Sequence, residues 1–265
     1  MGSFFMNSFP IGFFDSGVGG ITLWKSIKKL LPFENTIYLS DSKNCPYGKK
    51  SAKEINHRSS KNTQFLIDKN CKIIIVACNT ATTNSISMLR NKFKIPFIGI
   101  EPAIKPAALN SKTKKIGVLA TKGTLTSNLF FQTSSDHKLD VELINTYGEG
   151  LIELIENGDY GNKLNDLLKK YLNPMIEKGI DQLVLGCTHY PLIKKSIKNI
   201  VGNNVNIVDC NYAVALQTKN ILELNKLLNK NIEDSPKHIF YNSGEDNYAI
   251  KEILENKYEI FKFES

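Results

Sequence analysis

Two cysteines in this chain, Cys78 and Cys187, stand in the same local setting. Each follows a short run of branched apolar residues, and each is followed by two polar residues. Such runs, bounded by turn signals, are typical of buried parallel strands. A cysteine between the end of a strand and the start of a helix lies near free backbone amides, which favour the thiolate. Two such thiols on opposite sides of a substrate could remove a proton from one face of a carbon and return a proton to the other.

This reaction sets a requirement on both sulfur atoms. A thiolate acts as the base and a thiol as the acid, and the two exchange roles in the reverse direction. We therefore expect both cysteines to have similar pKa values, lowered modestly from the ordinary value of about 8.5. Asp15 and His189 are expected to hold or relay protons, Asp15 near Cys78 and His189 near Cys187.

Other interpretations of the same residues stay open. Either cysteine alone could be structural, because free cysteine is among the most buried residue types. A cysteine hydrolase would use Cys187 as nucleophile and His189 as base, and would leave Cys78 unexplained. A binding module without enzymatic activity would require both cysteines to be incidental.

Polar groups near the two cysteines can bind the carboxylates of a substrate through hydrogen bonds. The side chains that offer such donors are Ser16, Asn79, Thr80 and Thr188. The turn DSGVGG at residues 15–20 lacks the GK[ST] of a phosphate loop and is too short for a dinucleotide fingerprint. We expect its backbone amides to bind a small carboxylate, with a purely structural turn as the alternative.

The similarity between the surroundings of the two cysteines includes residues further upstream. A strand-like run leads into Asp15, and a similar run leads into Thr121. Asp15 precedes Cys78 by 63 positions, and Thr121 precedes Cys187 by 66. Two half-chains of similar plan predict two similar domains that face each other, and they make Thr121 a further candidate for the site.

The order of the expected elements is that of an α/β protein. Apolar runs of strand length alternate with stretches of helical apolar spacing, which predicts mainly parallel sheets. We expect two pseudo-symmetric α/β domains with the active site in the cleft between them. The first comprises residues 1–102 and 210–265 and carries Asp15 and Cys78, and the second comprises residues 103–209 and carries Cys187 and His189.

The C-terminal elements have no copy in the other half of the chain. The apolar spacing of residues 212–229 predicts a long helix, and strands are predicted over residues 237–242 and 258–263. We expect these elements to return to the first domain.

Composition narrows the class of protein. The chain has 265 residues, 42% hydrophobic and 23% charged, which is ordinary for a globular protein. No segment approaches the roughly 18 consecutive apolar residues of a membrane span, and residues 1–10 do not resemble a signal peptide. Five cysteines without CxxC spacing argue against a disulfide framework and a zinc cage. We expect a cytoplasmic protein with reduced thiols and no metal.

The net charge of +8 raises the question of nucleic-acid binding. Only Arg58 and Arg90 are arginines, and the remaining basic residues are lysines dispersed along the chain. Arginine is the usual residue for bidentate recognition of phosphates and bases. We expect a solvated lysine-rich surface, no nucleic-acid partner and no membrane partner.

Six motifs in order along the chain carry a resemblance to a known family. They are IGFFDSGVGGIT, DSKNCPYGKKS, VACNTAT, GIEPAIKPA, IGVLATKGT and LGCTHYPLI. Together they closely resemble bacterial glutamate racemase, a member of the aspartate/glutamate racemase family. The resemblance implies cofactor-independent interconversion of L- and D-glutamate, which supplies D-glutamate for peptidoglycan. It also implies two pseudo-symmetric α/β domains and a homodimer.

The resemblance assigns roles to residues of this chain. The two acid/base cysteines of the family fall on Cys78 and Cys187. The substrate-binding pairs of the family fall on Asp15 and Ser16, Tyr47 and Gly48, Asn79 and Thr80, and Thr188 and His189. A family glutamate near the site falls on Glu153 or Glu156, where this chain has YGEGLIELIE in place of the usual family sequence. Aspartate racemases and maleate isomerases also use two cysteines, but they generally lack the full DSGVGG and GCTHYP wording, so glutamate is favoured as substrate.

Overall fold

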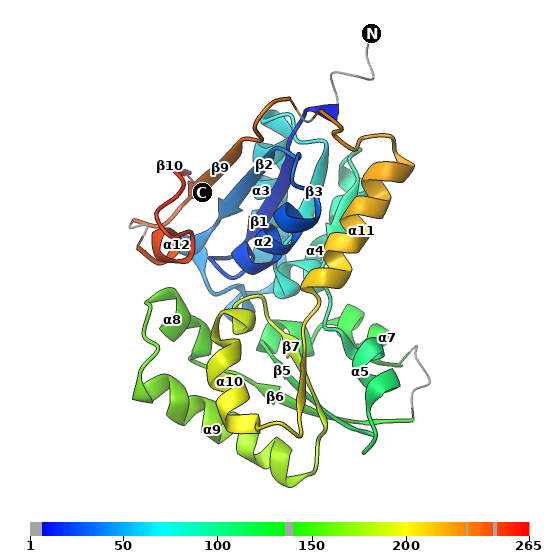
Figure 1. Cartoon of the computed structure of the whole chain (residues 1–265), viewed down its shortest axis with the longest axis vertical. Coiled ribbons are helices and arrows are strands. Elements are labelled where there is room, and N and C mark those ends of the chain that lie inside the picture. Colours follow the sequence, from blue (N-terminus) through cyan, green and yellow to red (C-terminus); the bar gives the residue numbers. More distant parts are fainter. Residues whose placement is uncertain (1–6, 136–139, 232, 246–247, 265) are drawn as a thin grey trace.

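Branched apolar runs form the central strands of two separate sheets, which lie in two units, one above the other in Figure 1. The computed structural model describes residues 7–135, 140–231, 233–245 and 248–264. The first sheet has the strand order β10-β9-β2-β1-β3-β4, and the second has the order β6-β5-β7-β8. Every pairing among the described strands is parallel. The predicted α/β class is confirmed.

The strands of the first sheet are β1 (Ile11–Asp15), β2 (Thr36–Ser40), β3 (Ile73–Val76), β4 (Phe97–Gly99), β9 (His238–Asn242) and β10 (Ile260–Lys262). Those of the second sheet are β5 (Lys115–Ala120), β6 (Glu142–Tyr147), β7 (Gln182–Gly186) and β8 (Asn206–Val208). The α-helices are α2 (Ile21–Leu30), α3 (Ala52–Asp68), α4 (Asn79–Lys92), α5 (Ile104–Asn110), α6 (Lys122–Leu125), α7 (Asn128–Ser135), α8 (Leu151–Glu156), α9 (Asn162–Glu177), α10 (Lys194–Val201), α11 (Asn211–Leu224) and α12 (Tyr248–Ile253). Short 3₁₀ helices are η1 (Ser42–Asn44), η2 (Tyr47–Lys49) and η3 (Tyr190–Ile193).

Helices cover both faces of each sheet because successive side chains of a strand point to opposite faces. In β3, Ile73 and Ile75 join the cluster with α2 and α11, while Ile74 and Val76 join the cluster with α3 and α4. The second sheet repeats this plan, with α8, α9 and α10 in one cluster and α5 and α7 in the other. Strands buried on both faces explain the uninterrupted apolar runs in the sequence.

Each sheet reverses its strand order at one point. In the first sheet β1 pairs with β2 on one side and β3 on the other. In the second, β5 likewise pairs with β6 and β7. Such a reversal opens a crevice at the carboxyl ends of the central strands, where ligands of open α/β sheets bind. Asp15 and Cys78 lie at the first crevice, and Thr121 and Cys187 lie at the second.

The C-terminal elements return to the first sheet, as expected. Helix α11 packs against α2, and β9 and β10 extend the sheet beyond β2 (Figure 1). The predicted helix over residues 212–229 was too long, since α11 ends at Leu224. Lys226 has a φ of 56°, in the left-handed region, and the amide of Leu227 donates to the carbonyl of Leu222. A residue in this conformation commonly ends an α-helix. Leu227 and Leu228 continue the apolar spacing because they pack on the core after the helix has ended.

A buried ion pair fastens the segment after α11 to the base of the first sheet. Lys72 Nζ lies 2.5 Å from Glu34 Oε2, and the two side chains are 0% and 2% exposed. Lys72 also donates to the carbonyl of Leu227, and Glu34 accepts from the amide of Asn229. Burial raises the pKa of Glu34 and lowers the pKa of Lys72, so desolvation opposes the attraction between them.

Among the described residues, no helix is long and apolar enough to cross a membrane.

We expect Lys72→Met to lower the free energy of unfolding by about 3–5 kcal/mol, because it leaves Glu34 charged, buried and unpaired. Urea denaturation followed by circular dichroism measures this change. The control is Lys194→Met, which removes the exposed ion pair with Asp209 and should cost about 1 kcal/mol or less. Adding Glu34→Gln to Lys72→Met should recover part of the loss, and an undiminished stability of Lys72→Met would contradict this account.

Candidate active site

Cys78 lies at the amino end of a helix in the first unit. It is the N-cap of α4, and its Sγ accepts a hydrogen bond from the amide of Ala81 at 3.5 Å. This helix begins at Asn79, directly after the cysteine. Within its first turn, the buried hydroxyl of Thr82 donates to the carbonyl of Val76.

Cys187 lies one residue beyond the end of β7 in the second unit. Thr188 and His189 follow it and precede η3, so the polar residues of the motif form the connection itself. Cys187 and His189 are both buried, at 5% and 1% exposure. His189 Nδ1 lies 3.8 Å from the sulfur of Cys187. The imidazole is therefore placed to exchange a proton with this thiol.

One cavity lies between the two units and is lined by residues of both. Its lining is Ser16, Tyr47, Gly48, Cys78, Asn79, Thr80, Thr121, Ile152, Cys187, Thr188 and His189. The structure thus brings together the substrate-binding pairs predicted from sequence, apart from Asp15, which is fully buried behind them. Ile152 was not predicted. The cavity volume of about 10 Å³ holds about one water molecule, so the cleft is closed.

Asp15 lies at the centre of a hydrogen-bond network behind the cavity. Its Oδ1 accepts from the amide of Ser16, and its Oδ2 accepts from the amide of Gly20. The hydroxyl of Thr188, from the second unit, also donates to Oδ2 at 3.2 Å. Asp15 reaches Cys78 through Ser16, whose Oγ lies 3.6 Å from the sulfur. Burial raises the pKa of Asp15 to about 6, against the opposing effect of the charge on His189.

The glycine-rich turn serves a purpose other than the one expected from sequence. The amides of Ser16, Val18 and Gly20 donate to Asp15 and Glu156, which are carboxylates of the protein itself. Its glycines also allow the two units to touch. A Cβ at Gly19 would lie 2.6 Å from the backbone nitrogen of His189, so a larger residue would force the units apart.

The structure distinguishes the two candidate glutamates. Glu156 Oε1 lies 2.5 Å from His189 Nε2 and accepts from the amide of Val18 at 2.8 Å. Glu153 instead pairs with Lys49 at the surface, with its side chain 36% exposed. Glu156 is therefore the glutamate at the site. Both lie on the short helix α8, and sequence periodicity could not show which one faces His189.

The pKa values differ from the sequence expectation. Burial, and then the negative charge of Asp15, raise the pKa of the Cys78 thiol well above its ordinary value. The predicted lowering was wrong for this residue because the closed cleft excludes water, and the hydrogen bonds of the sulfur with the Ala81 amide and the Ser16 hydroxyl are too weak to offset desolvation. Burial alone would lower the pKa of His189, but hydrogen bonds to Cys187, Cys45 and Glu156 raise it well above the usual range.

One buried donor in the cavity has no partner. Asn79 Nδ2 makes no hydrogen bond to any described residue, although buried polar groups are rarely left unsatisfied. The nearby hydroxyls of Thr80 and Thr121, one from each unit, lie 2.8 Å apart and share a hydrogen bond. Asn79 is thus a free donor for the oxygen atoms of a ligand.

A further residue missed from the sequence is Cys45, whose sulfur lies 3.8 Å from Glu156 Oε1. It stands in the loop between η1 and η2, where nothing local distinguishes it. Of the residues described, Cys45, Glu156 and His189 form the one group whose atoms could hold a metal ion.

Comparison with known proteins identifies the family. The sequence model of the Asp/Glu/hydantoin racemases matches residues 20–218. The glutamate racemase of Clostridium novyi is 43% identical over 246 residues, which make up 92% of this chain and 95% of that protein. The structure of Francisella tularensis glutamate racemase in complex with D-glutamate has a TM-score of 0.85, 31% identity and 98% coverage of both chains. That of Escherichia coli glutamate racemase in complex with L-glutamate and the activator UDP-MurNAc-Ala has a TM-score of 0.84 and 29% identity, covering 96% of this chain and 97% of that one. With the two parallel sheets and the shared cleft, these matches establish that the chain belongs to the Asp/Glu/hydantoin racemase family.

Proposed function

We propose that this protein interconverts L- and D-glutamate by a cofactor-independent, two-base mechanism. One observation carries the proposal: Cys78 and Cys187 follow equivalent strands of two separate sheets and line the same cavity. The choice of glutamate is supported by relatives named glutamate racemase and by two similar structures solved with D- and L-glutamate.

In the proposed reaction, one sulfur acts as a thiolate and the other as a thiol. The thiolate takes the α-proton from one face, and the electron pair left on the α-carbon is delocalised into the α-carboxyl group. The opposite thiol then donates its proton to the other face of the carbon. One S–H bond forms and another breaks, so the two sulfurs have exchanged protonation states at the end of a turnover.

Polar groups of the cavity would hold the substrate during this transfer. Asn79 offers an unpartnered amide, and Ser16, Thr80 and Thr188 offer hydroxyls. Tyr47 and Gly48 line the same wall, and Thr121 faces Thr80. The ammonium group of an amino acid would bring a positive charge beside the Cys78 thiol and so lower its raised pKa.

Asp15 and His189 would act on opposite sides of the substrate. Asp15 contacts Ser16, which contacts Cys78, so its negative charge makes the Cys78 thiolate a stronger base. His189 contacts Cys187 through Nδ1 and is held by Glu156 through Nε2. We propose Glu156 as a positioning residue that keeps the imidazole protonated.

Substrate entry would require the two units to separate, because the closed cavity is too small for an amino acid. We propose that they are domains with the boundaries predicted from sequence, 1–102 with 210–265 and 103–209. Contacts across the cleft include polar ones, such as Lys49 with Glu153 and Thr188 with Asp15. Polar contacts of this kind can exchange with water as the cleft opens.

The biological setting follows from the proposed reaction. We propose that the enzyme supplies D-glutamate for peptidoglycan in the cytoplasm, where its five free cysteines would stay reduced.

We also propose a homodimer. Exposed apolar side chains on α11 offer a surface for it, namely Tyr212, Leu216 and Leu224.

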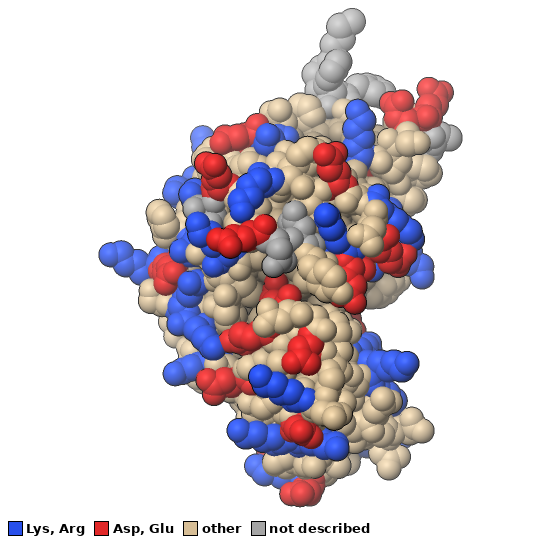
Figure 2. Space-filling model, turned by 90° about the vertical axis from the view of Figure 1, so that its left-hand side faces the viewer, with Lys and Arg blue, Asp and Glu red and all other residues tan. Residues whose placement is uncertain are grey.

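Acidic and basic side chains are interspersed on the face shown in Figure 2, which supports a solvated surface without a nucleic-acid partner.

A cysteine hydrolase remains the second candidate, since Cys187, His189 and Glu156 lie in contact like a thiol, base and orienting acid. It assigns no role to Cys78, although that sulfur lines the same cavity. The racemase proposal uses both thiols and is therefore preferred.

The first test is exchange of the α-hydrogen in D₂O, followed by NMR. L-glutamate, D-glutamate and L-aspartate are offered separately to protein treated with chelator and free of pyridoxal phosphate. We expect deuterium incorporation from both glutamate enantiomers and none from aspartate, because both faces of the carbon meet a thiol. The absence of exchange with all three would favour the hydrolase or a binding module.

The two-base mechanism predicts that Cys78→Ala and Cys187→Ala each lower kcat for racemisation by about 10³-fold or more, since each removes an obligatory acid or base. Cys210→Ala, which alters a cysteine outside the cavity, should retain activity. Circular dichroism verifies that each variant is folded. Full activity in either cavity variant would exclude the mechanism.

The proposed role of Glu156 predicts a change in the pH profile. The Glu156 carboxylate raises the pKa of His189, so Glu156→Gln should lower that pKa and move the alkaline limb of kcat to lower pH. We expect kcat to fall by roughly ten- to a hundredfold, as for the loss of a charge-assisted hydrogen bond. The matched control Glu153→Gln removes a surface ion pair and should leave both limbs in place. Equal profiles for the two variants would refute the assignment.

A further inference from the structure

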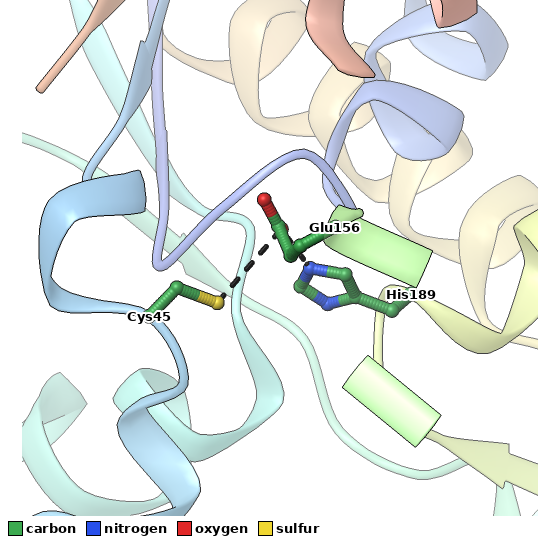
Figure 3. Close-up of side chains that lie close together, drawn as sticks. All are labelled: Cys45, Glu156 and His189. Atoms are coloured by element: carbon green, nitrogen blue, oxygen red, sulfur yellow. Dashed lines mark hydrogen bonds and ion pairs between the residues drawn. The ribbon is translucent and has the colours of Figure 1, made fainter. Parts of the chain in front are cut away.

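Three side chains from distant segments meet beside the cavity (Figure 3). Cys45 comes from the loop after η1, Glu156 from the end of α8, and His189 from the connection after β7. Their sulfur, oxygen and nitrogen atoms all lie within 4.8 Å of one another. Within this group, Glu156 Oε1 lies 2.5 Å from His189 Nε2 and 3.8 Å from Cys45 Sγ.

We propose that Cys45, Glu156 and His189 form a binding site for Zn²⁺ and that zinc bound there inhibits the enzyme. Thiolate, imidazole and carboxylate are the protein ligands that zinc takes, at about 2.0–2.3 Å from the ion. Ligands at these distances in a tetrahedron lie roughly 3.3–3.7 Å apart. The 3.8 Å contact between Cys45 and Glu156 is close to this length, and the contact between Glu156 and His189, at 2.5 Å, needs to open by about 1 Å.

The surroundings fit a metal site in two respects. Gly17 lets the group close, because a Cβ there would lie 1.9 Å from Glu156 Oε1 and 3.1 Å from Cys45 Sγ. A second cavity, of about 350 Å³, is lined by Val18, Glu156 and Asn157, so one of the three ligands also borders an open space. Three protein ligands leave the fourth position of zinc open for water.

Zinc at this position would remove groups that the proposed reaction uses. The ion would bind His189 at Nε2 and hold the remaining ring proton at Nδ1, which faces Cys187. The imidazole could then no longer accept and release protons, and Glu156 would no longer support it. This inhibitory consequence rests on the proposed racemase function, whereas the metal site itself does not.

Binding would release the proton of Cys45. Burial raises the pKa of this thiol to about 12, so the metal has to displace a firmly held proton. Zinc ions deprotonate coordinating thiols outright, which makes the exchange feasible.

The test begins with spectroscopy, which needs no activity. Co²⁺, a coloured substitute for Zn²⁺, is titrated into the reduced, metal-free protein. We expect a thiolate-to-cobalt charge-transfer band in the near ultraviolet that is lost in Cys45→Ser and kept in Cys210→Ser. Cys210 is the matched control because it is also partly buried and free, but lies outside the group. Absence of the band in the unaltered protein, or its persistence in Cys45→Ser, would overturn the proposed site.

Inhibition is then measured with ZnCl₂ during glutamate racemisation. Each variant is compared with its own rate without zinc, because Cys45 contacts Glu156 and contributes to the raised pKa of His189. In Cys45→Ser the zinc concentration for half-inhibition should rise by roughly tenfold or more. Cys210→Ser should respond like the unaltered protein. Bound zinc with unchanged activity would overturn the inhibitory role. If the metal-free protein does not racemise glutamate at all, the proposed function fails while the cobalt spectra still decide the metal site.

Discussion

The close contact between the glycine-rich turn of the first unit and the Cys187–His189 segment of the second is the constraint on which this structure depends. Gly17 and Gly19 have no side chains, and any Cβ at either position would collide with Glu156 or His189. The contact lets Glu156 accept hydrogen bonds from Val18 and from His189 at once. It also lets Thr188 donate to Asp15 across the cleft. The contact that closes the cleft therefore also positions the charged groups within it.

This closure sets the electrostatics of the site. Exclusion of water raises the pKa of Cys78 and of Asp15, because burial disfavours the charged form of an acid. Burial alone would lower the pKa of His189, but hydrogen bonds to Cys187, Cys45 and Glu156 raise it and so favour the charged form of the imidazole. The two thiols consequently have different neighbours, Cys78 beside Ser16 and Cys187 beside His189. The pseudo-symmetry of the backbone does not extend to the side chains beside the two thiols, so the two directions of the proposed reaction would meet different neighbouring groups.

Much of the fold could be predicted because local rules govern it. Buried parallel strands require uninterrupted apolar runs, and the runs before Cys78 and Cys187 are β3 and β7. The repeat of strand-end residues predicted two units with matched crevices, as observed at β1, β3, β5 and β7. The end of α11 was misplaced because Leu227 and Leu228 keep the helical spacing of apolar residues after the chain has turned. Apolar residues that pack on the core can therefore continue the helical spacing beyond the end of a helix.

The sequence by itself determined the chemical groups of the site, because strand ends and turn residues are encoded by neighbours along the chain. Asp15, Cys78, Cys187 and His189 could all be named from such local patterns. Only the tertiary structure decided between Glu153 and Glu156, brought Cys45 beside His189 and raised the pKa of Cys78. These properties depend on distances between segments from 33 to 138 residues apart along the chain and on the exclusion of water between them. The spacing of residues along the chain determines neither a distance across a cleft nor the exclusion of solvent from it.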